Sequence, residues 1–92
     1  MISGHATSDG TRNFAKRQSN VAKNHFKSFA GLSLSSVGIG TYLGNPDNIT
    51  DKLVTESTKM SVKSGINVID TAINYRAQKA ERSVGKTIAE LE

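Results

Sequence analysis

The stretch from residue 65 to residue 92 constrains the fold of this chain more than any other. Residues 66–72 are rich in isoleucine and valine, which is typical of a strand buried on both faces of a sheet. A polar loop follows, and small or apolar side chains then recur at helical spacing, at Ala80, Val84, Thr87, Ile88 and Leu91. A buried strand, a loop and an amphipathic helix in this order predict a βα unit of a parallel sheet. Gly85, beside the helical stripe, is expected to let the helix approach the sheet closely.

A second unit of the same kind precedes this one. Residues 36–41 are expected to form a strand with Gly38 and Gly40 on one face. Glycine weakens a strand interior, so two glycines indicate a close approach by another backbone or by a ligand. We interpret Gly40 as the point where a ligand comes near. Tight packing or a bulge in the strand is the alternative.

A helix is expected after a loop that contains the single proline of the chain. Its pattern begins at Asp51, with Asn48 or Thr50 as the N-cap, and a carboxylate in the first turn favours the positive end of a helix. Lys63 complements the opposite end, and Gly65 is expected to end the helix in a left-handed conformation. The order strand, helix, strand, helix predicts a parallel sheet covered by helices.

The chain upstream of these units divides into two parts. Residues 26–34 contain two short apolar segments around a glycine, which predict a β-hairpin. Residues 1–25 are expected to be an N-terminal extension, flexible or partly helical near residues 11–17. The first 27 residues carry five basic side chains and one aspartate, so the whole formal charge of +4 lies there. Such a segment is typical of nucleic-acid-binding arms and of organelle transit peptides, but we favour a solvated extension.

Two stretches resemble a known family. Residues 65–72, followed by residues 74–76 and by Glu81, Val84 and Gly85, resemble the second βα unit of the aldo-keto reductases. Residues 37–42 resemble the first-strand signature of the same family, and two motifs at a family-like separation are more specific than one. The resemblance covers residues 26–92. It implies a fold of the α/β class, the N-terminal part of a (β/α)8 TIM barrel, with a hairpin and about two βα units.

The resemblance also implies an activity and a site. A complete barrel needs about 250 residues, so a chain of 92 residues would supply its N-terminal fragment. The enzyme would reduce an aldehyde or ketone carbonyl with hydride from NADPH. Tyr75 would donate the proton, while Asp70 would hold a catalytic lysine and contact the nicotinamide ribose. Gly40, Thr41 and Tyr42 would contact the cofactor.

Other readings of these residues stay open. The family's lysine and histidine belong to the next two strands, beyond Glu92, so the 92-residue chain is expected to be inactive by itself. From the residues alone, Asp70 could accept hydrogen bonds from backbone N–H groups of its own loop. Tyr75 could equally be a half-buried anchor with its hydroxyl in water.

Three function classes therefore remain. The first is a fragment of an NADPH-dependent oxidoreductase, and the second is a reductase-like cofactor-binding or regulatory subunit without turnover. The third is a small basic nucleic-acid-binding protein, which we disfavour because Phe14 is the only aromatic residue within residues 1–25 available for base stacking.

The composition sets further limits. Cysteine is absent, which excludes a disulfide framework and a thiolate metal site. No apolar run approaches the ~20 residues of a membrane span. The first residues lack the basic-then-apolar order of a secretory signal. We expect a cytoplasmic chain with a small carbonyl substrate, no metal, and neither a membrane nor a nucleic acid as partner.

Overall fold

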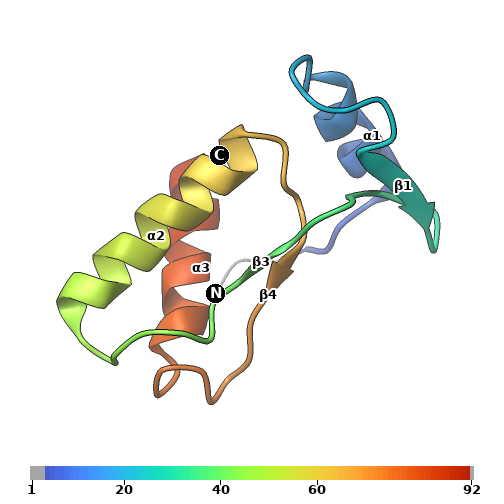
Figure 1. The fold of residues 1–92 in the computed structure, drawn as a ribbon. Helices are drawn as coiled ribbons and strands as arrows, with labels where there is room; N and C mark the ends of the chain where they lie inside the picture. Colours follow the sequence, from blue (N-terminus) through green and yellow to red (C-terminus); the bar gives the residue numbers. More distant parts are fainter. Residues whose placement is uncertain (1–3, 92) are drawn as a thin grey trace.

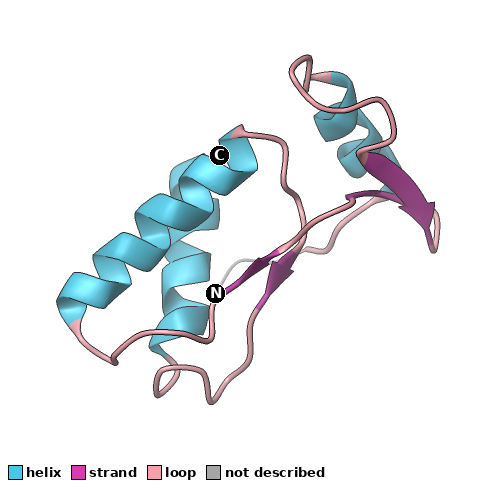
Figure 2. Cartoon of the chain, viewed as in Figure 1, coloured by secondary structure: helices cyan, strands magenta, loops and turns pink. Residues whose placement is uncertain are grey.

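The computed structural model describes residues 4–91. Within that range the chain forms three helices and two two-stranded sheets. In Figure 1, α2 and α3 lie side by side along one sheet and α1 lies beside the other. Figure 2 shows the same arrangement by type of secondary structure. The elements in chain order are α1 (Ser8–Lys16), β1 (Phe26–Phe29), β2 (Leu32–Ser35), β3 (Ile39–Gly40), α2 (Asn48–Lys63), β4 (Ile69–Asp70) and α3 (Lys79–Leu91).

The strands β3 and β4 are parallel and are connected through α2. Ile39 lies opposite Ile69, and Gly40 lies opposite Asp70. The Ile39 N–H donates to the Val68 carbonyl over 3.0 Å, which extends the pairing at its start. The predicted parallel βαβ arrangement is therefore confirmed.

Both parallel strands are much shorter than the expected ranges 36–41 and 66–72. The side chain of Asn67 explains part of the difference. Its Oδ1 accepts from the Ser35 N–H over 2.7 Å, and its Nδ2 donates to the Ser33 carbonyl over 2.8 Å. Asn67 thus links the second strand region to the end of β2, where regular pairing between strands was expected.

The ends of α2 differ in how well they follow the sequence pattern. Asp47 is the N-cap, and its Oδ1 accepts from the Thr50 N–H over 2.8 Å. The prediction of Asn48 or Thr50 as the N-cap is wrong. The helix begins one residue after Asp47, whose carboxylate accepts the otherwise unpaired N–H of Thr50. At the other end, Gly65 has φ +104°, which confirms the left-handed ending.

The contact between α2 and α3 is made of small and mostly polar side chains. Ala80 and Val84 are the only apolar side chains classed as buried among residues 4–91. The Thr87 hydroxyl is buried and donates to the carbonyls of Ser83 and Thr55, over 2.9 and 3.3 Å. The buried Thr87 hydroxyl is therefore satisfied, whereas the fully buried Thr58 hydroxyl of α2 has no hydrogen-bond partner within residues 4–91.

Two expectations for α3 are wrong. Ile88 is 41% exposed although it belongs to the predicted apolar stripe, and the buried Ser83 was not part of that stripe. Nothing lies within 4 Å of the position that a Cβ would take at Gly85, so this glycine does not permit a close approach. The helix turns its small side chains toward α2, which moves the buried face away from Ile88.

The predicted hairpin is confirmed, with β1 and β2 antiparallel around Ala30 and Gly31. Both turn residues have positive φ, +51° and +80°, as in the tight turns that favour hairpins. The helix α1 packs on β2, where the Ser33 N–H donates to the Thr11 hydroxyl over 3.0 Å. Part of the basic N-terminal extension is therefore docked on the hairpin.

Candidate functional site

The residues expected at the site gather where β3 and β4 end. Gly40 and Asp70 are paired across the parallel strands, and each is the last residue of its strand. Thr41 follows Gly40, and its N–H and its hydroxyl both donate to the Asp70 carbonyl, over 3.1 and 2.9 Å. The carboxyl ends of neighbouring parallel strands are where open α/β sheets and barrels bind ligands.

The two tyrosines complete this strand end. Tyr42 follows β3, and Tyr75 lies in the loop between β4 and α3. Their ring centroids are 5.0 Å apart with the ring planes at 78°, an edge-to-face contact. Tyr75 is half-buried, whereas Tyr42 is exposed. Two motifs about thirty residues apart in the chain thus meet through a direct side-chain contact.

The two glycines of β3 and its entry have different surroundings. A Cβ on Gly38 would lie 3.1 Å from the Val68 carbonyl oxygen, so this glycine permits close packing against the residue that precedes β4. A Cβ on Gly40 would meet nothing within 4 Å. The tight-packing alternative therefore applies to Gly38, while the flank of Gly40 is open to a ligand.

The carboxylate of Asp70 is free within residues 4–91. Asp70 is exposed, and no backbone N–H or side-chain donor in that range binds its carboxylate. The alternative that Asp70 caps its own loop is therefore wrong. Thr41 differs, because it is 2% exposed and its hydroxyl already donates to a carbonyl. Thr41 links the ends of β3 and β4 through these hydrogen bonds and has no free hydroxyl proton for a ligand.

The loop after Tyr75 has an unusual backbone. Arg76, Ala77 and Gln78 have φ of +50°, +54° and +73°. Each left-handed residue other than glycine costs about 1–2 kcal/mol relative to the right-handed form. The Tyr75 N–H donates to the Ala72 carbonyl over 3.1 Å, so Tyr75 lies between a regular turn and this left-handed segment. No glycine marks this segment in the sequence, and the sequence analysis missed it.

Arg76 is the main functional candidate that the sequence analysis passed over. Its side chain is 0% exposed. The Nε donates to the Asn45 carbonyl over 3.0 Å, and Nη2 forms a short ion pair with Oδ1 of Asp51. Lys79 lies 3.4 Å from the other carboxylate oxygen. The residue stood inside the family-like motif, but nothing in the local pattern signals that it is buried.

The neighbours of the Asp51 carboxylate stabilise its charged form. Partial burial by itself would raise its pKa, but hydrogen bonds from Arg76 and Lys79 outweigh that effect and lower the pKa of Asp51 below its ordinary value. Hydrogen bonds from Thr50 likewise lower the pKa of Asp47. Both carboxylates therefore remain charged at neutral pH at the start of α2.

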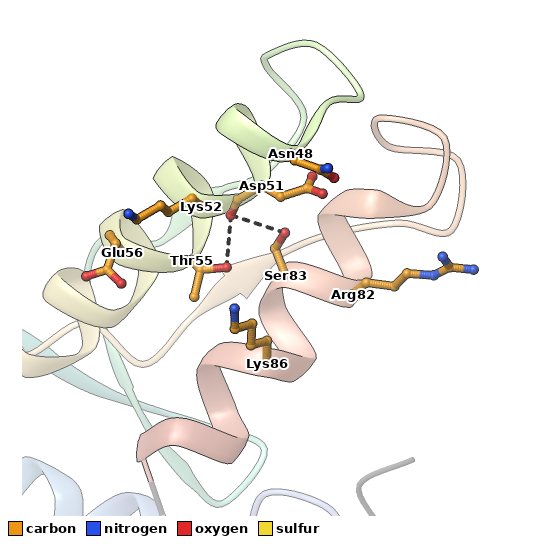
Figure 3. A pocket seen from close by; sticks show the side chains of 8 residues that line it. All are labelled: Asn48, Asp51, Lys52, Thr55, Glu56, Arg82, Ser83 and Lys86. Atoms are coloured by element: carbon orange, nitrogen blue, oxygen red, sulfur yellow. Dashed lines mark hydrogen bonds between the residues drawn. The ribbon is translucent and has the colours of Figure 1, made fainter.

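Two of the cavities involve α2. Figure 3 shows a polar one of about 420 Å³ between α2 and α3, where the hydroxyls of Thr55 and Ser83 donate to the Asp51 carbonyl. Its lining is Asn48, Asp51, Lys52, Thr55, Glu56, Arg82, Ser83 and Lys86. A smaller cavity of about 260 Å³ includes Gly40 and residues of α2. Neither cavity is lined by Asp70 or Tyr75.

Residues 4–91 contain neither a candidate metal site nor a candidate membrane span. No group of three or more histidine, aspartate or glutamate side chains there is arranged to hold a metal ion. No helix in the same range combines the length and the apolar character needed to cross a bilayer. No protein-family model matches the chain, and a search of solved structures gave no significant match.

Proposed function

We propose that this chain is the N-terminal part of an NADPH-dependent aldo-keto reductase, with Tyr75 as the proton donor to an aldehyde or ketone carbonyl. One observation carries the proposal. The pairing of Gly40 with Asp70 and the contact of Tyr42 with Tyr75 bring both family-like motifs to the same end of two parallel strands. That end is where a (β/α)8 barrel binds its ligands.

The exposed apolar surface supports a barrel that continues around these strands. Leu43, Ile49, Leu53 and Met60 are each more than half exposed, at 82%, 77%, 61% and 65%. They lie on α2 and on the loop before it. A soluble protein rarely leaves several large apolar side chains uncovered along one helix, so this flank is suited to a further βα unit.

The residues present fit a nicotinamide dinucleotide at two points. Gly40 leaves open space beside the strand end, so a cofactor can approach the backbone there. Asp70 offers an exposed carboxylate without a donor in residues 4–91, which suits contact with a ribose hydroxyl or a lysine ammonium. Tyr42 presents an exposed aromatic ring next to Gly40. Thr41 would contribute through its backbone position only.

The proposed chemistry assigns one proton transfer to this chain. NADPH, when bound, supplies the hydride to the carbonyl carbon. The Tyr75 hydroxyl gives its proton to the carbonyl oxygen, so the products are the alcohol and a phenolate that must be reprotonated. Asp70 would hold a lysine from a later strand against that phenol, since a nearby cation favours the phenolate. The edge-to-face contact with Tyr42 restricts the orientation of the Tyr75 ring.

The first test is the reading frame beyond codon 92, which should encode a strand that ends in lysine and another that ends in histidine. The second is reduction of simple aldehydes by that product with NADPH. Tyr75→Phe is expected to lower kcat by about 10²–10⁴-fold with little change in KM for NADPH, because only the acidic proton is lost.

Arg82→Gln is the control, since it changes an exposed residue of α3 away from the strand ends and should leave kcat within a few-fold. Unchanged turnover in Tyr75→Phe would reject Tyr75 as the acid. A frame that stops at codon 92, together with no NADPH binding, would reject the reductase altogether.

A further inference from the structure

The two tyrosines are carried by two separate loops. Tyr42 belongs to residues 41–47, between β3 and α2, and Tyr75 belongs to residues 71–78, between β4 and α3. Neither loop has regular backbone pairing to the other. Beyond the two hydrogen bonds of Thr41 at the strand ends, the contact between the rings depends on a side chain that joins the loops.

Arg76 joins them from a buried position. It follows Tyr75 directly, and its Nε donates to the carbonyl of Asn45, three residues after Tyr42, over 3.0 Å. Its Nη2 binds Asp51 in the first turn of α2 and also approaches the Asp47 carbonyl at 3.5 Å. One guanidinium thus holds the second loop, the end of the first loop and the start of the helix.

The backbone around Arg76 makes this link necessary. Arg76 begins three consecutive left-handed residues, none of them glycine. Such conformations persist only where surrounding contacts enforce them. The Arg76 side chain is 0% exposed, so its bonds are shielded from water, and its Nη1 is buried with no partner within residues 4–91. The left-handed backbone and the unpaired Nη1 both destabilise the fold, so the bonds of Arg76 to Asn45 and Asp51 must hold the side chain firmly in place.

We propose that Arg76 is a positioning residue, which holds the Tyr75 loop against the Tyr42 loop and so sets the contact between the two rings. Lysine cannot replace it, because a single ammonium lacks the planar fork that reaches the Asn45 carbonyl and the Asp51 carboxylate together. The consequence for carbonyl reduction rests on the proposed function. The positioning itself does not.

The chain offers a direct readout, since it contains two tyrosines and no tryptophan. In protein with labelled tyrosine, NMR cross-peaks between the Tyr42 and Tyr75 rings report their contact without any cofactor. We expect Arg76→Gln to lose these cross-peaks at a temperature where circular dichroism still shows the helices, and Arg76→Lys to weaken them strongly. The control Arg82→Gln removes an exposed arginine from α3 and should keep them.

A residue that only stabilises the fold would leave the cross-peaks intact below the unfolding temperature. Wild-type cross-peaks in folded Arg76→Gln would therefore overturn the proposal. If Arg76→Gln does not fold, Asp51→Asn decides, because it keeps the shape of the partner and removes its charge. Weakened cross-peaks in Asp51→Asn support Arg76 as a positioning residue, and unchanged ones reject it. Lost cross-peaks, together with a reading frame that stops at codon 92 and a product that binds no NADPH, would support Arg76 and reject the reductase.

Discussion

The two loops that leave the parallel strands reach the same place by different means. Residues 41–47 turn through Gly44, whose φ of +113° is accessible to glycine without strain. Residues 71–78 turn through three left-handed residues that all carry side chains, beginning at Arg76. The first loop has a glycine, Gly44, at the position where its backbone is left-handed. The second depends on buried contacts made elsewhere in the molecule, chiefly those of Arg76.

This difference indicates where the candidate site is fragile. The Tyr42 loop should keep its shape as long as Gly44 is present, whereas the Tyr75 loop should keep its shape only while α2 and the first loop hold it. The two are also coupled, since a Cβ on Gly44 would lie 3.7 Å from Nε of Arg76. Changes at three positions test this comparison.

The largest effect is expected at Gly44. Alanine there would place its Cβ 2.6 Å from Cγ2 of Thr50 in a left-handed backbone. Strain and overpacking together should lower the free energy of unfolding by about 3 kcal/mol. Gly40→Ala is the matched control, because its flank is open, and it should stay within about 1 kcal/mol of wild type. Urea unfolding of both variants measures the contrast, and equal losses would contradict it.

A smaller effect, of opposite sign, is expected at Ala77. Ala77→Gly removes the left-handed strain of the folded state but raises the conformational entropy of the unfolded state. The free energy of unfolding should therefore rise by about 0.5–1 kcal/mol. Ala89→Gly, in the right-handed last turn of α3, should instead cost up to about 1 kcal/mol. The two changes are chemically identical, so a shared sign in thermal unfolding would show that the left-handed segment stores no strain.

The smallest effect is expected in acid. The pKa of Asp51 is lowered in the folded chain by Arg76 and Lys79 despite partial burial, so its stabilising contribution is complete above the ordinary aspartate pKa of about 4. That contribution disappears as the pH falls through the lower folded value. Asp51→Asn should flatten the decline of the unfolding temperature below about pH 4.

The groups that face Asp51 are Arg76, Lys79 and the neighbouring Asp47, whose pKa is also lowered. Part of the acid sensitivity should therefore survive in Asp51→Asn and disappear when Asp47→Asn is added. An unchanged acid profile in the double variant would mean that the ion pairs at the start of α2 do not hold the Tyr75 loop.

The order of elements was predictable because it depends on local patterns. The apolar run around Ile69, the glycine at the end of α2 and the turn at Gly31 each act within a few residues. They were enough to predict a hairpin and a parallel pair of strands. The meeting of Asp70 with Gly40 followed from the same patterns, since parallel strands end at the same edge.

The rest depends on contacts between distant parts of the chain. Asp47 as the cap of α2, the burial of Arg76 and the left-handed residues after it have no periodic signal, and they arise only once α2 and α3 pack together. His25 has no periodic signal either, yet it is half-buried and its Nε2 donates to the Gly65 carbonyl over 2.8 Å.

The hydroxyl-rich contact between α2 and α3 also determines how this chain should melt. Thr58 and Thr87 are fully buried, at positions where packed helices usually have large apolar side chains such as leucine. Exposing hydroxyls and carbonyls adds little to the heat capacity of unfolding, because hydration of polar surface opposes the contribution of hydrocarbon. Calorimetry of residues 1–92 should therefore give a small rise in heat capacity on unfolding, and further apolar side chains packed over α2 should enlarge that rise.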